Sequence, residues 1–76
     1  YNRELVLQTL SSTLLFIKNH PENPDVKNLH DIRKNLEMIL FGESFENIDD
    51  WKKYETDLKA MDKDIAEKLI SEMRKQ

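Results

Sequence analysis

Apolar residues recur along the chain at the spacing of α-helices. In residues 2–19 they fall at i, i+3, i+4 and i+7, which predicts an amphipathic helix. A second set of apolar side chains lies outside this main stripe, so the helix is apolar over an unusually large part of its circumference. The main stripe comprises Val6, Leu7, Leu10, Leu14 and Ile17, and the additional set comprises Leu5, Leu15 and Phe16.

A second helix is predicted over residues 24–41. Asn23-Pro24-Asp25 is typical of a helix start, with Asn as N-cap, Pro at the first helical position and an acid in the first turn. Gly42 predicts its end. Arg33 interrupts the apolar stripe, and we expect its aliphatic stem to lie along the edge. The stripe comprises Val26, Leu29, Ile32, Leu36, Ile39 and Leu40, with Met38 and Phe41 outside it.

The last helix is predicted over residues 48–75, after an acidic connector in which Phe45 and Ile48 point inward. Its apolar positions keep one phase to the end of the chain, which favours a single helix, bent near Met61. The alternative is that Asp62 or Asp64 caps a fourth helix. The apolar face comprises Trp51, Tyr54, Leu58, Met61, Ile65, Leu69 and Met73.

Together these elements predict one all-α domain over residues 1–76. We expect a small up-down bundle of three helices, with four helices as the alternative. Because the chain begins at Tyr1 rather than Met, it could be part of a longer protein. The expected core comprises Leu10, Leu14, Ile17, Leu29, Ile32, Leu36, Ile39, Leu58 and Ile65.

The composition of the chain excludes several kinds of function. The net charge of −3 disfavours nonspecific binding to nucleic acid, and the chain has no cysteine for disulfides or thiolate ligands. The longest apolar run, residues 14–17, is far shorter than the ~20 residues of a membrane span, so membrane insertion is not expected. No signal sequence is visible, so the cytoplasm is the default location.

The segment of residues 18–32 holds both histidines, His20 and His30, and three acidic residues. His20 precedes Pro21, which predicts that it ends the first helix. The segment has no HExxH motif and no histidine pair at i, i+4, so we expect a bend between helices and no metal site. A pH-sensitive contact is the lesser alternative. A glycine-rich phosphate loop and a nucleophile elbow are also missing, and we expect neither an enzyme nor a cofactor.

Two functions remain, both based on surface contacts. The first is a non-enzymatic protein–protein interaction module, self-associating or with another protein, that uses the extra apolar surface of the first helix. The second is a small acidic inhibitor or immunity-type protein that neutralises a toxin or enzyme through residues 43–57. Candidate contact residues for the module are Leu5, Leu15, Phe16, Trp51 and Tyr54, and those for the inhibitor are Glu43, Glu46, Asp49 and Asp50.

Overall fold

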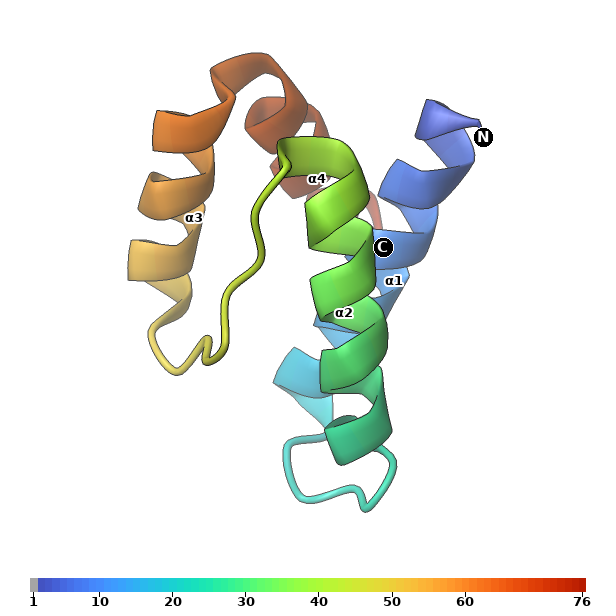
Figure 1. Cartoon of the computed structure of the whole chain (residues 1–76). Helices are drawn as coiled ribbons and strands as arrows, with labels where there is room; N and C mark the ends of the chain where they lie inside the picture. Colours follow the sequence, from blue (N-terminus) through green and yellow to red (C-terminus); the bar gives the residue numbers. More distant parts are fainter. Residues whose placement is uncertain (1) are drawn as a thin grey trace.

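The chain folds into a small bundle of α-helices (Figure 1). The computed structural model describes residues 2–76, and within that range it contains four helices and no strand. The predicted all-α fold is therefore confirmed, in its four-helix form. The helices are α1 (Arg3–Asn19), α2 (Val26–Phe41), α3 (Trp51–Met61) and α4 (Lys63–Lys75).

Helix α1 packs against α2 on one side and α4 on the other, while α3 packs against α4. Residues 42–50 run as a non-helical connector between α2 and α3 (Figure 1). The connector contributes Ile48 to the core. The core lies mainly among α1, α3 and α4; its buried members are Leu7, Leu10, Leu14, Leu40, Ile48, Tyr54, Leu58, Ile65, Ala66 and Leu69.

The ends of α1 and α2 follow local hydrogen bonding. Helix α1 ends at His20, whose backbone N–H donates to the carbonyl of Phe16. Asn23 is not the N-cap of α2, as its Oδ1 accepts from the Asp25 N–H at 2.9 Å and forms a turn ahead of the helix. Gly42 ends α2 with φ at 77°, a left-handed conformation that glycine adopts without a Cβ penalty.

The expected single helix over residues 48–75 is wrong, because Asp62 divides it into α3 and α4. Asp62 has extended backbone angles, φ −156° and ψ 101°, and its Oδ1 accepts from the Ile65 N–H at 3.1 Å. Its own N–H donates to the carbonyl of Leu58. One residue thus ends α3 and caps α4, while the apolar spacing continues across the break and hides it from periodicity.

The expected burial of α2 is also wrong in part. Leu10, Leu14, Ile17, Leu58 and Ile65 are buried as expected. In α2, however, Ile32 and Ile39 are 45% and 43% exposed, and Leu29 and Leu36 are only half-buried. The buried residues of this helix are Arg33, Glu37 and Leu40.

Candidate functional site

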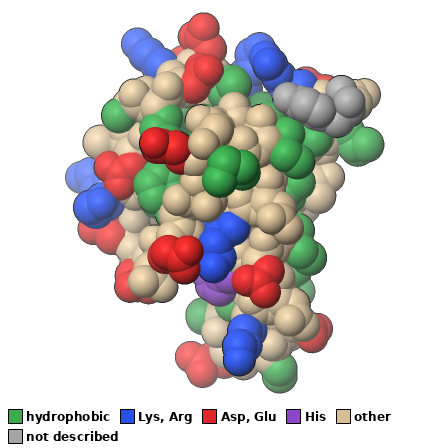
Figure 2. Space-filling model, viewed as in Figure 1, with side chains coloured by type: hydrophobic (Ala, Val, Ile, Leu, Met, Phe, Trp, Pro, Cys, Tyr) green, Lys and Arg blue, Asp and Glu red, His purple; other side chains and the backbone are tan. Residues whose placement is uncertain are grey.

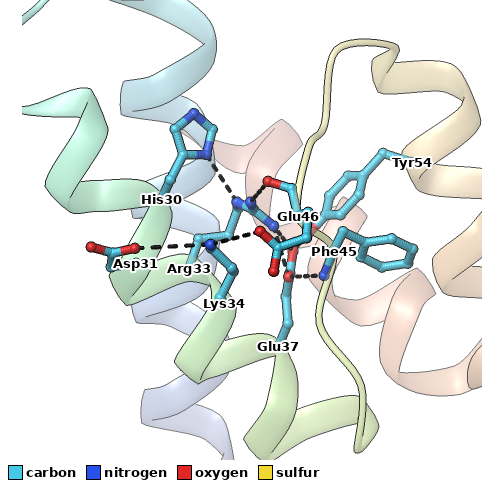
Figure 3. Close-up of polar contacts among 8 residues, drawn as sticks. All are labelled: His30, Asp31, Arg33, Lys34, Glu37, Phe45, Glu46 and Tyr54. Atoms are coloured by element: carbon cyan, nitrogen blue, oxygen red, sulfur yellow. Dashed lines mark hydrogen bonds and ion pairs between the residues drawn. The ribbon is translucent and has the colours of Figure 1, made fainter.

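The side of α2 that faces the connector holds a buried ion pair (Figure 3). Arg33 and Glu37 lie one turn apart and their side chains are completely buried. The Arg33 Nη1 donates to both carboxylate oxygens of Glu37, at 2.8 and 2.9 Å. From α3, the hydroxyl of Tyr54 donates to Glu37 Oε2. We refer to Arg33, Glu37 and Tyr54 as the buried polar cluster.

The buried polar cluster also holds the connector. The Phe45 N–H donates to Glu37 Oε1 at 3.0 Å, and Arg33 Nη2 donates to the backbone carbonyl of Glu46 at 3.3 Å (Figure 3). Nearer the surface, Lys34 Nζ lies 3.3 Å from the Glu46 carboxylate. Because α2 and α3 have the connector between them, these contacts join the two helices through it.

Burial shifts the pKa of two neighbouring groups. Burial of Tyr54, together with the Glu37 charge and hydrogen bond, raises the pKa of its phenol well above the ordinary value of 10.0, so the hydroxyl keeps its proton and donates. Burial lowers the pKa of His30 below 6.5, and the charges of Arg33 and Lys34 act in the same direction. The His30 Nδ1 accepts from Arg33 Nε at 3.2 Å, which requires that nitrogen to be unprotonated.

The groups of the buried polar cluster satisfy one another. Glu37 accepts from Arg33, Tyr54 and Phe45, and no buried side-chain nitrogen or oxygen in residues 2–76 lacks a partner. A buried ion pair is tolerated at low energetic cost when its remaining hydrogen-bonding capacity is filled in this way. This arrangement is suited to holding two helices and a connector in register.

Sequence reasoning missed this cluster. Arg33 was expected at the edge of an apolar stripe, Glu37 was given no role, and the contact between His30 and Arg33 was not predicted. The available signal was the i, i+4 spacing of Arg33 and Glu37. Such pairs are common on solvated helix faces, so the spacing alone does not indicate burial.

The two histidines make separate contacts. His20 is exposed at the end of α1, where its ring lies 4.7 Å from that of Phe16. His30 instead contacts Arg33. Across residues 2–76, the structure contains no group of three His, Asp or Glu side chains placed to hold a metal ion. Within the same range, no helix has the length and apolar character needed to cross a bilayer.

A second feature is an apolar surface formed by α1 and α2. Leu5 is 60% exposed on α1, on the same stripe as the half-buried Phe16, three turns further on. Phe16 and Leu29 line an open hollow of about 480 Å³ between the two helices. Ile32 lies one turn from Leu29, and Ile39 lies two turns from Ile32. We name Leu5, Phe16, Leu29, Ile32 and Ile39 the α1–α2 face.

The α1–α2 face carries few charges in a chain in which 36% of residues are charged. No charged residue occurs in α1 between Glu4 and Lys18. The hollow is completed by two hydroxyls, one amide and a single acid, from Ser12, Thr13, Asn28 and Asp25. Figure 2 shows hydrophobic side chains along the right-hand side of the view, where Figure 1 places α1 and α2.

The other candidate contact residues lie apart from this face. Leu15 is half-buried on α1, while Trp51 is half-buried at the start of α3, where Lys18 Nζ lies 5.8 Å from its ring centroid. Tyr54 is buried, and its ring meets those of Phe45 and Trp51 edge-on. Tyr54 therefore offers little surface to a partner.

The four acidic candidates, Glu43, Glu46, Asp49 and Asp50, are all exposed on the connector. Two of them also have local roles. Asp50 caps α3 by accepting from the Lys53 N–H at 3.1 Å, and Glu46 pairs with Lys34. The acidic segment is thus an ordered part of the fold, attached to α2 through the buried polar cluster.

Comparison of the chain with family models, curated proteins and solved structures finds no match.

Proposed function

We propose that this chain is a non-enzymatic protein–protein interaction module that binds through the α1–α2 face. The observation that supports the proposal most directly is the exposure of Leu5, Ile32 and Ile39 on two adjacent helices. Isolated exposed hydrophobic residues are ordinary, whereas a contiguous apolar patch on a small domain usually marks an interface. The hollow between α1 and α2 joins Phe16 to Leu29, and helical spacing places Leu29, Ile32 and Ile39 on one side of α2.

The charge distribution favours an uncharged partner surface. Interface cores are depleted of charged residues relative to the rest of a protein surface, and the α1–α2 face has that character. The bordering groups, Ser12, Thr13 and Asn28, can each donate and accept hydrogen bonds. Such a surface can also pack against a second copy of itself without opposing like charges, although the chain has a net charge of −3.

Self-association is therefore the first property to measure. Multi-angle light scattering should give a mass above the 9.1 kDa of one chain, rising with protein concentration. The double variant Ile32→Lys/Ile39→Glu leaves the net charge unchanged and should lower the mass to that of one chain. Circular dichroism should remain helical, because both side chains are partly exposed.

The matched control is Glu67→Lys/Lys68→Glu, which reverses two exposed charges on α4 at constant net charge. It should associate like the wild type. A wild type that stays at 9.1 kDa at every concentration contradicts self-association. Equal loss of association in both double variants contradicts the assignment to the α1–α2 face.

The acidic inhibitor remains a second candidate, supported by the exposure of all four connector carboxylates. The two functions differ in their response to salt. Contact through the α1–α2 face should depend weakly on ionic strength, because few charges take part. Association through the connector should slow steeply as salt is added, because exposed charges more than about 10 Å apart are screened at 0.1 M salt. Charge reversal at Glu43 and Asp49 should then abolish the salt dependence.

A further inference from the structure

His30, Arg33 and the connector are linked through one planar group. The guanidinium of Arg33 donates in three directions: Nε to His30 Nδ1, Nη1 to Glu37 and Nη2 to the carbonyl of Glu46 (Figure 3). The group is rigid, so a change in its plane that weakens one of these bonds alters the others. Arg33 therefore links His30 to the connector by hydrogen bonds.

The backbone of the connector has few other attachments. Within the described residues 2–76, the hydrogen bonds from Phe45 to Glu37 and from Arg33 to Glu46 are the only ones that the backbone of residues 43–49 makes to the rest of the protein. Ile48 is buried and anchors the far end of the connector by apolar packing. The backbone hydrogen bonds around Phe45 and Glu46 thus depend on Arg33 and Glu37, while the Phe45 ring packs on Tyr54 and the Glu46 carboxylate pairs with Lys34.

The surroundings of His30 combine charges of both signs. On α2 it faces Arg33 and Lys34, which oppose a further positive charge, and Glu37 and Asp31, which favour one. Lys18 of α1 and Asp49 of the connector line the same hollow as His30, with opposite signs. The closest contact, between His30 Nδ1 and Arg33 Nε at 3.2 Å, determines the effect of a proton. Protonated Nδ1 would place the N–H of one cation against the N–H of another.

We propose that His30 is a proton-sensitive latch, whose protonation turns the Arg33 guanidinium and releases the connector around Phe45 and Glu46 while the helices stay folded. The hydrogen-bond acceptor at Nδ1 becomes a donor on protonation, so the latched arrangement requires the neutral imidazole. When the connector is released, the pKa of His30 returns toward its ordinary value of 6.5. The latch is accordingly intact above pH 6.5 and weakens as the pH falls from there through the lowered pKa of the latched His30, because the open state binds the proton more readily.

Amide hydrogen exchange measured by NMR at about pH 7.5 and about pH 5 tests the latch. The protection factor of the Phe45 amide, which corrects for the intrinsic effect of pH, should be lower at the acidic value. The amide of Leu10, in the middle of α1, should keep its protection at both. His30→Gln places a non-titrating acceptor near Arg33, and Phe45 should then stay protected at both pH values.

The matched control is His20→Gln, which removes the exposed histidine and should leave the pH response of Phe45 unchanged. Equal protection of Phe45 at the two pH values in the wild type overturns the latch. An equal acidic loss in His30→Gln also overturns it, because the response then comes from another group. In His30→Gln the Phe45 amide could lose protection at both pH values, and the NMR titration of the wild-type His30 ring then distinguishes the two cases. A titration midpoint below 6.5 supports the latch, and a midpoint at or above 6.5 overturns it.

Discussion

Helices α2 and α4 are both amphipathic in sequence, yet they use their faces in opposite ways. In α4 the apolar side packs into the core, and the buried residues are Ile65, Ala66, Leu69 and Ile70. In α2 the side that packs most deeply carries Arg33 and Glu37, whereas Ile32 and Ile39 are exposed. The same kind of sequence pattern therefore leads to two different orientations.

The neighbours of each helix explain the difference. Helix α4 packs against two other helices, α1 and α3, whose backbone hydrogen bonds are internally satisfied, so apolar side chains meet apolar side chains. Helix α2 packs against α1 and, on the side of Arg33 and Glu37, faces a non-helical connector. The connector brings backbone N–H and C=O groups that must find partners when covered. Arg33 and Glu37 supply those partners to Phe45 and Glu46.

The largest expected effect comes from breaking the ion pair. Glu37→Ala leaves the guanidinium of Arg33 buried without its carboxylate, and we expect a loss of about 3–5 kcal/mol of unfolding free energy. That is a large share of the about 4–11 kcal/mol expected for a domain of this length. Urea denaturation measures it. The double variant Arg33→Met/Glu37→Leu removes the uncompensated charge and should recover part of the loss. The remainder reflects the Phe45 N–H and the Tyr54 hydroxyl, which then lack their acceptor.

The corresponding change in α4 tests ordinary apolar packing. Leu69 is completely buried, so Leu69→Ala should cost about 2–5 kcal/mol through lost burial and a cavity. The adjacent exposed Lys68→Ala serves as control and should change the unfolding free energy by less than about 0.5 kcal/mol. Similar losses in both variants would show that the burial assigned to α4 is wrong.

A smaller effect is expected where α3 meets the buried polar cluster. Tyr54→Phe keeps the ring packing and removes only the donor to Glu37, so the cost should be about 1.5–3 kcal/mol. In the background of Arg33→Met/Glu37→Leu the same change should cost less, because the acceptor is gone. Additive costs in this double-mutant cycle would argue against the Tyr54–Glu37 bond.

The smallest of these effects lies at the junction of α3 and α4. Asp62→Ala removes the side-chain acceptor for the Ile65 N–H and should cost about 1 kcal/mol. Asp62→Asn keeps a capping oxygen and should cost much less. Thermal melting of the two variants separates them; equal melting temperatures would indicate that the cap contributes nothing.

Local rules predict the all-α fold class, the ends of α1 and the end of α2 at Gly42, so these features could be predicted from the sequence. The sequence also predicts that apolar side chains such as Leu5 and Phe16 are partly exposed, because a helix with two neighbours cannot cover so wide an apolar surface. It does not reach the break at Asp62, since one capping residue interrupts a helix without changing the phase of its apolar positions.

The orientation of α2 could not be predicted from the sequence, for a different reason. Periodicity shows that Leu29, Ile32, Leu36 and Ile39 share a side, but burial depends on what packs against that side. On the side of Arg33 and Glu37 the neighbour is a connector whose backbone groups have no partners within a helix, which makes a polar contact favourable there. No local rule of spacing contains that tertiary information.

The central claim is that α2 buries the side that carries Arg33 and Glu37 and exposes Ile32 and Ile39. It is tested most directly by two truncations on that helix. Glu37→Ala and Ile39→Ala lie two residues apart and introduce the same residue, so differences in helix propensity are small. Urea denaturation of both should give a loss of about 3–5 kcal/mol for Glu37→Ala and less than about 1 kcal/mol for Ile39→Ala. The reverse ranking, with Ile39→Ala the more costly, would contradict the account.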